Sequence, residues 1–128
     1  MAKSVKAMLE ADSYDGPALI IAYSHCIAHG INMTTAVDNC KRAVNSGYWP
    51  LFRFDPRLAA EGKNPLQLDS RDPSIAFTDF ANSENRFRVL KQNNPEQADQ
   101  LMAASAKDSA TRYDLYKKLA ALSADCGK

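Results

Sequence analysis

The sequence predicts an α/β fold in which a short parallel sheet is flanked by helices and followed by a helical C-terminal tail. Residues 18–23 form a continuous apolar run, typical of a strand buried on both faces of a parallel sheet. A helical stretch separates this run from a second, aromatic run at 48–54, and that spacing indicates a right-handed βαβ unit. We therefore expect one domain over 1–128, with the βαβ core portion in 1–72 and a helical extension in 73–128.

Length and composition are those of an ordinary folded domain. The chain has 128 residues, of which 45% are hydrophobic and 24% charged, and this balance excludes an intrinsically disordered protein. No apolar run approaches the ~20 residues that span a bilayer, and the first residues lead into no secretory signal. A net charge of +1 favours neither nucleic acid nor a membrane surface as a partner. We therefore expect a cytoplasmic chain.

The chain before the first apolar run is predicted to be a helix that ends in a turn. Val5, Met8 and Leu9 have the i, i+3, i+4 spacing of one helix face. Residues 14–17, Tyr-Asp-Gly-Pro, then provide turn chemistry, because glycine accepts a positive φ and proline cannot continue a helix.

A second helix is predicted between the two apolar runs. Thr34 or Thr35 can cap its start, and Gly47 can end it. Three apolar side chains share one of its faces: Val37, Cys40 and Val44.

The predicted strand at 48–54 contains Pro50, which cannot donate to a ladder and so places this strand at a sheet edge or at a bulge. A loop region follows, in which residues 66–68, Leu-Gln-Leu, form a short extended piece. Short helices are then expected over 75–80 and 84–92.

A long helix is predicted for the C-terminal third of the chain. Asn94 is its cap and Pro95 lies in its first turn. Acidic residues near its start and lysines near its end suit the helix dipole. Its apolar positions keep a helical period: Ala98, Leu101, Met102, Ser105, Tyr113, Tyr116, Leu119 and Leu122.

The three cysteines, Cys26, Cys40 and Cys126, are an odd number at wide spacing. They form no disulfide framework and fit a reducing compartment. There is no C-x-x-C motif, and three thiolates cannot by themselves supply the four ligands of an ordinary iron–sulfur cluster. Cys40 is expected to pack as a small hydrophobe, and Cys126 is assigned no role.

Residues 23–30, Tyr-Ser-His-Cys-Ile-Ala-His-Gly, carry most of the candidate chemistry. They follow the end of the first predicted strand, where open α/β sheets place ligands. Cys26 with His25 and His29 could hold zinc or iron, and a nucleophilic Cys–His pair is a further alternative. The plain alternative is a loop cysteine between two surface histidines.

Three stretches of the sequence together resemble the C-terminal part of pyruvate:ferredoxin (flavodoxin) oxidoreductases: residues 14–30, 47–58 and 62–65. Asn85-Arg86-Phe87 and the terminal helix are similar as well. The resemblance implies that the chain is the C-terminal part of a thiamine diphosphate-binding domain. It implies an intact enzyme, expected to be a homodimer, that converts pyruvate and coenzyme A to acetyl-CoA and CO2. This enzyme would use thiamine diphosphate, Mg²⁺ and 4Fe–4S clusters, and would pass electrons to ferredoxin or flavodoxin.

The resemblance implies one ligand in this chain: Cys26 would be the last ligand of the cluster nearest the thiamine. The diphosphate and magnesium residues and the other cluster cysteines are missing. We therefore expect an inactive segment that binds no cofactor by itself and has the remainder of the oxidoreductase as its partner. We also expect an exposed apolar surface beside 18–23, which would lead to self-association. The alternative is a freestanding interaction or assembly module without catalysis.

Overall fold

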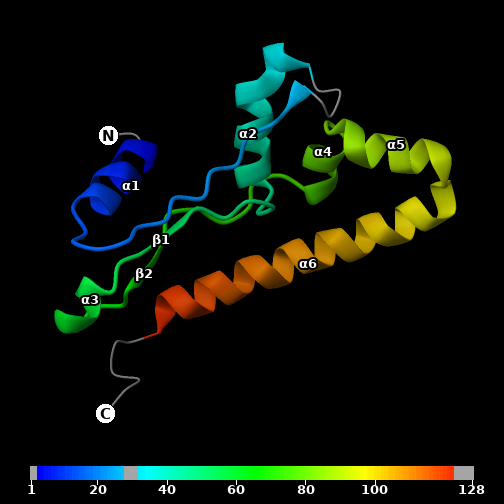
Figure 1. The fold of residues 1–128 in the computed structure, drawn as a ribbon. Coiled ribbons are helices and arrows are strands. Elements are labelled where there is room, and N and C mark those ends of the chain that lie inside the picture. Colours follow the sequence, from blue (N-terminus) through cyan, green and yellow to red (C-terminus); the bar gives the residue numbers. More distant parts are fainter. Residues whose placement is uncertain (1–2, 28–31, 123–128) are drawn as a thin grey trace.

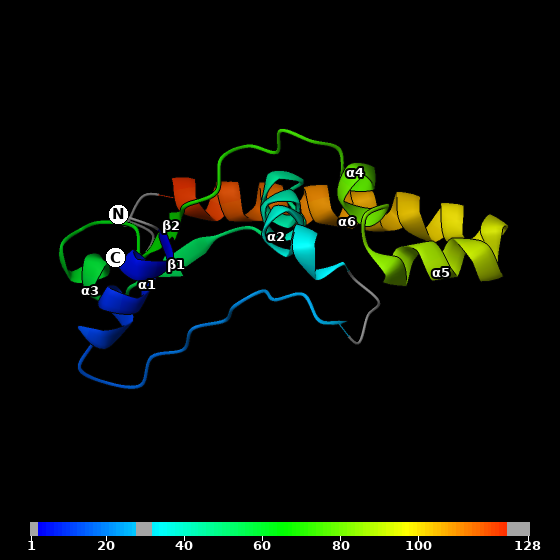
Figure 2. The same ribbon diagram turned by 90° about the horizontal axis from the view of Figure 1, so that it is seen from above.

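The computed structural model describes residues 3–27 and 32–122 (Figure 1). Helices account for most of the described chain, and two short strands form its sheet. Figure 2 shows the long helix α6 (Pro95–Ala121) along the molecule, with an extended segment before α2 (Ala36–Asn45) running beside α2. Strand β1 (Phe52–Phe54) follows α2 along the chain.

Helix α1 (Lys3–Asp12) confirms the first predicted helix, although it buries none of its residues. The predicted apolar face, Val5, Met8 and Leu9, is exposed. Polar contacts hold the helix to the sheet, because the Glu10 carboxylate accepts hydrogen bonds from Arg53 of β1. The lysine at its start, Lys3, also donates to the carbonyl of Asp69.

The predicted strand at 18–23 is an extended segment without a strand partner in the described part of the chain. Most of its side chains lie open to solvent, Tyr23 being half-buried: Leu19 is 85% exposed, Ile20 51% and Ile21 69%. The expected apolar surface is therefore confirmed at the segment itself. A strand forms only where a neighbouring backbone supplies hydrogen bonds, and the two strands of the structure pair with each other instead.

Helix α2 confirms the second predicted helix, but its buried face is rotated from the predicted one. Its buried residues are Ala36, Asn39 and Ala43, whereas Val37 is exposed and Cys40 is only half-buried. A 3-10 turn, η2 (Met33–Thr35), precedes it, and the Asn32 side chain accepts from the Thr34 N–H there. Thr35 occupies the N-cap position of α2 without a side-chain capping bond. The helix ends before Gly47, whose φ is +74°, as predicted.

The predicted parallel sheet and βαβ unit are wrong. Strand β1 pairs with β2 (Leu66–Leu68) in an antiparallel sheet whose register joins Phe52 to Leu68 and Phe54 to Leu66. The intervening loop contains the short helix α3 (Arg57–Ala60) and turns the chain back on itself. A connection that reverses direction can join only antiparallel strands, since parallel strands need a crossover. Pro50 lies before β1, outside the ladder.

The core lies where α2, α4 (Phe77–Ala81), α5 (Asn85–Asn93) and α6 meet. It consists of four buried residues, Ala43, Phe77, Phe80 and Ala81. Partly buried side chains pack around them: Tyr23, Tyr48, Trp49, Phe87, Met102 and Ala106. Burial of these aromatic rings supplies much of the hydrophobic stabilisation that joins the helices.

Helix α6 confirms the predicted long helix together with its cap. The Asn94 side chain accepts from the Gln97 N–H, and Pro95 occupies the first turn. Of the predicted apolar positions, Ala98 and Tyr113 are buried, whereas Leu101 remains exposed. The helices predicted over 75–80 and 84–92 are also present, as α4 and α5.

Candidate functional site

The segment from Tyr23 to Cys26 runs in extended form beside α2 (Figure 1), and its side chains alternate in exposure. Tyr23 and His25 are half-buried, whereas Ser24 and Cys26 are exposed. Successive side chains of an extended backbone point to opposite sides. One side of the segment therefore faces the body of the molecule and the other faces solvent.

Tyr23 joins the segment to the aromatic cluster around the core. Its ring lies 5.4 Å from that of Trp49 and 6.4 Å from that of Tyr48, centroid to centroid. Its hydroxyl accepts a hydrogen bond from Arg86 at 3.5 Å. Burial raises the pKa of the Tyr23 hydroxyl, and the negative charge of Glu84 raises it further. This tyrosine is thus a neutral anchor, held by ring packing and by one hydrogen bond to its hydroxyl.

His25 contacts a cysteine, but not the neighbouring Cys26. Its Nδ1 lies 3.3 Å from the Sγ of Cys40 on α2, within hydrogen-bond distance. The sequence predicts that Cys40 packs as a small hydrophobe; in the structure it is half-buried, and its thiol has a polar partner in addition. The two residues are fifteen positions apart. No local spacing in the sequence could identify this contact, since it depends on how the segment lies against α2.

Cys26 is exposed, and its thiol is free. Because the His25 ring is turned toward Cys40, the structure does not support a nucleophilic Cys26–His25 pair. His29 and Cys126 lie outside the described residues. Across residues 3–27 and 32–122, no group of three or more His, Cys, Asp or Glu side chains could hold a metal ion. Cys26 therefore presents a single exposed thiol.

Glu84 is a buried carboxylate beside Tyr23 that the sequence pattern did not single out. The residue is 2% exposed, and its Oε2 lies 3.6 Å from the Nε of Arg86. Within the described residues its Oε1 has no hydrogen-bond partner. Arg86 in turn lies over the Tyr48 and Phe87 rings. Glu84 and Arg86 thus form a polar connection between the start of α5 and the extended segment.

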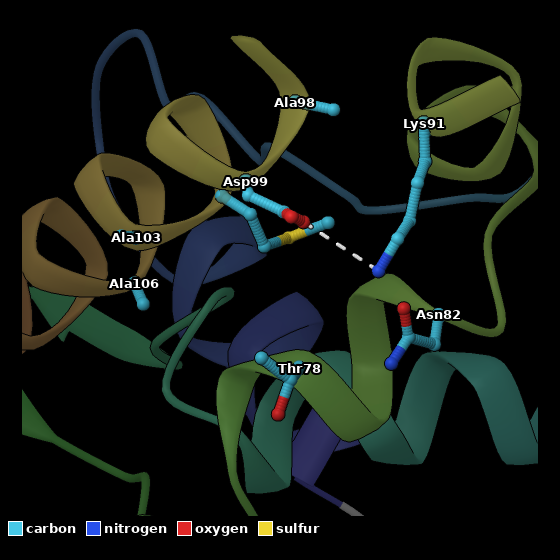
Figure 3. Close-up of a pocket in the computed structure, with 8 residues that line it drawn as sticks. Thr78, Asn82, Lys91, Ala98, Asp99, Ala103 and Ala106 are labelled. Atoms are coloured by element: carbon cyan, nitrogen blue, oxygen red, sulfur yellow. Dashed lines mark ion pairs between the residues drawn. The ribbon is translucent and has the colours of Figure 1, made fainter. Parts of the chain in front are cut away.

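A hollow of about 280 Å³ lies between α4, α5 and α6 (Figure 3). An ion pair crosses it, with the Lys91 Nζ 3.5 Å from the Asp99 carboxylate. Both of these side chains are well exposed, and alanines and Met102 make up much of the lining. The hollow offers neither a cysteine nor a histidine, so the Tyr23–Cys26 segment remains the candidate site.

Among the residues that the structure describes, no helix has the length and apolar character needed to cross a membrane.

Comparison with known proteins places the chain within much larger oxidoreductases. It is 53% identical over 116 residues to the pyruvate:ferredoxin oxidoreductase of Moorella thermoacetica. The matched residues make up 91% of this chain and 10% of that protein. It is 52% identical over 118 residues to the pyruvate-flavodoxin oxidoreductase of Trichormus variabilis, covering 92% of this chain and 10% of that protein.

A third relative, the mitochondrial pyruvate dehydrogenase [NADP(+)] of Euglena gracilis, is 46% identical over 121 residues. These residues make up 93% of this chain and 7% of that protein. No protein-family model matches the chain. The chain thus spans about a tenth of the length of the curated relatives it matches, and it corresponds to a small segment of pyruvate:ferredoxin and pyruvate-flavodoxin oxidoreductases.

Proposed function

We propose that the chain serves as a segment of an enzyme that oxidises pyruvate with coenzyme A to acetyl-CoA and CO2 and passes the electrons to ferredoxin or flavodoxin. The observation that carries this proposal is the match of nine-tenths of the chain, at 53% identity, to a pyruvate:ferredoxin oxidoreductase. The chain matches 10% of that relative, so most of the catalytic machinery would belong to the remainder of the enzyme. By itself the chain should therefore show no pyruvate-dependent reduction of an electron acceptor.

The proposed place of the segment is the C-terminal part of the thiamine diphosphate-binding domain, with residues 1–128 belonging to that one domain. Thiamine diphosphate, Mg²⁺ and 4Fe–4S clusters would belong to the intact enzyme. The exposed Cys26 fits a cluster ligand in this setting, because a thiolate that faces outward can reach a cluster held by cysteines from elsewhere. The cluster would transfer electrons, and the role of Cys26 is to hold one of its irons.

The extended segment at 18–23 would become a strand in the intact enzyme. Its apolar side chains are exposed in this chain, and it has no strand partner within residues 3–27 and 32–122. A strand that is apolar on both faces is typical of the interior of a parallel sheet covered by helices. The remainder of the oxidoreductase would supply the neighbouring strands and the covering helices.

The same exposed surface also favours the second candidate function, a freestanding interaction module that binds a partner protein without catalysis.

Under the main proposal the intact enzyme would be a homodimer in the cytoplasm. Free thiols at Cys26 and Cys40 are consistent with such a reducing compartment.

The decisive experiment compares wild-type intact oxidoreductase with its Cys26→Ala variant. Iron and acid-labile sulfide are measured together with the electron paramagnetic resonance (EPR) spectrum of the reduced enzyme. Loss of one thiolate leaves an iron open to water, so the variant should lose iron or show an altered cluster signal. Ser24→Ala is the matched control, because Ser24 is exposed on the same side of the segment. Unchanged iron and an unchanged spectrum in Cys26→Ala would contradict the ligand role.

A further inference from the structure

The direction in which the Cys26 side chain points depends on the contacts of two nearby half-buried residues, Tyr23 and His25. Within the described residues, the backbone of 17–26 forms no strand ladder. Ladder hydrogen bonds would normally fix the register of an extended segment, and a slip of one residue turns every side chain to the opposite side. Here the register is fixed by Tyr23 and His25, which are half-buried.

These two contacts differ in how narrowly they define the geometry. Tyr23 packs against Trp49 and Tyr48 through ring faces and edges, and such apolar contact tolerates sliding. Its hydroxyl also accepts from Arg86, but at 3.5 Å, the outer limit of hydrogen-bond distance, so this bond restrains the segment weakly. The His25 contact is polar and joins one atom to one atom, Nδ1 to Sγ of Cys40, at 3.3 Å. Hydrogen bonds weaken steeply when their distance or angle departs from the optimum. The His25–Cys40 contact therefore sets the register more narrowly than the aromatic packing does.

We propose that His25 and Cys40 are positioning residues for Cys26: their contact turns His25 toward α2 and so directs the adjacent Cys26 thiol away from this chain, toward its ligand. The ligand, an iron of a cluster held by the rest of the oxidoreductase, rests on the proposed function. The positioning itself is a property of this chain and can be tested without the cluster. His25 can orient Cys26 because the two residues are adjacent, and adjacent side chains of an extended backbone point in opposite directions.

The first experiment measures alkylation of Cys40 by iodoacetamide in the isolated chain, at fixed pH, with labelled peptides quantified by mass spectrometry. Opening of the segment away from α2 exposes Cys40, so its labelling rate reports on the contact. His25→Gln moves the polar group from the δ to the ε position and should raise the Cys40 rate about fivefold, as expected for loss of one net hydrogen bond. His25→Asn keeps a polar group at the δ position and should stay near the wild-type rate.

Ser24→Ala is the control in this experiment. Ser24 is exposed and its hydroxyl donates to the carbonyl of His25 at 3.1 Å, so the substitution alters the same stretch of backbone without touching the His25 ring and should leave the Cys40 rate unchanged. Cys26 should be labelled rapidly in every variant, since its thiol is already exposed. A thermal melt of each variant separates local opening from unfolding of the whole chain. Equal Cys40 rates in His25→Gln and His25→Asn, whether both raised or both unchanged, would overturn the proposal.

The second experiment uses the intact oxidoreductase and reads the EPR spectrum and midpoint potential of its clusters. Both quantities respond to the orientation and environment of the ligating sulfur. His25→Gln and Cys40→Ala should keep the wild-type iron content but shift the signal and potential of one cluster. His25→Asn and Cys40→Ser, which keep a hydrogen-bonding group, should restore both. Wild-type spectra in Cys40→Ala would overturn the positioning role.

The two proposals fail in different ways. If Cys26→Ala keeps its iron and spectrum, the ligand role of Cys26 is wrong, whereas a difference between His25→Gln and His25→Asn in Cys40 labelling still establishes the contact. If Cys26→Ala loses iron but His25→Gln leaves the Cys40 rate and the cluster signal unchanged, Cys26 is a ligand that does not depend on His25 and Cys40.

Discussion

Arg53 on strand β1 binds the carboxylate of Asp69 through two parallel hydrogen bonds, of 2.6 Å from Nε and 3.0 Å from Nη2. Its guanidinium also donates to Gln67 and to the Glu10 carboxylate. The Arg53 side chain is 12% exposed, so these bonds are largely shielded from water. A single arginine thus ties the N-terminal helix α1 to both the sheet and the residue that follows β2.

Acid should weaken this connection through Asp69. The Arg53 guanidinium holds the pKa of the Asp69 carboxyl below its usual value. A carboxyl whose pKa is lower in the folded state contributes stability above its unfolded pKa of about 3.9, and that contribution is lost as the pH falls through the folded pKa. We expect Asp69→Asn to lower the free energy of unfolding at pH 7 by about 2 kcal/mol, the order of a hydrogen bond to a charged group.

Urea unfolding at a series of pH values measures this effect, and the difference between wild type and Asp69→Asn should shrink toward pH 2. Asp99→Asn is the control. Asp99 belongs to an ion pair whose side chains are 60% and 70% exposed, and its loss should cost less than about 1 kcal/mol. A constant difference between wild type and Asp69→Asn at all pH values would contradict the prediction.

The extended apolar segment should cause self-association of the isolated chain. Leu19 and Ile21 are exposed, and an unpaired extended segment can pair with another chain. We expect sedimentation velocity to show larger species at high protein concentration in the wild type. The double substitution Leu19→Lys with Ile21→Lys should shift the protein to monomer, because charge opposes such pairing.

Leu115→Lys is the matched control for association, since Leu115 is also exposed but lies on α6. It should leave the association of the chain unchanged if the segment is responsible. A wild-type chain that remains monomeric at every concentration would contradict the prediction. Loss of association in Leu115→Lys alone would assign it to α6 instead.

Gly47 should be less replaceable than Gly62, although both have a positive φ. An added Cβ at Gly47 would lie 2.9 Å from Cγ of the Pro73 ring, whereas one at Gly62 would meet no atom within 4 Å. Gly62→Ala should therefore cost only the backbone strain of a left-handed residue, about 1 kcal/mol, and Gly47→Ala about 2 kcal/mol or more. Urea unfolding of both variants measures the difference. Equal losses would show that the Pro73 ring moves aside freely.

Local sequence determined the helices and their ends. Asn94 and Pro95 start α6 as predicted, and Gly47 follows the end of α2, because capping and positive φ depend only on a few adjacent residues. The apolar period also identified α1 and α5. The short extended piece at 66–68 is likewise present, as β2.

Tertiary structure decided which faces and partners these elements use. Strand β1 pairs with β2, and the His25 ring is turned toward Cys40, which is half-buried because of the way α2 is rotated. These contacts all join residues that are distant along the chain. The apolar run at 18–23 indicates burial on both faces, yet it is exposed here, since a strand needs neighbours that these residues do not supply. The spacing of apolar side chains indicates which face of a helix or strand is apolar. Only the packing of the whole chain determines which backbone or side chain contacts that face.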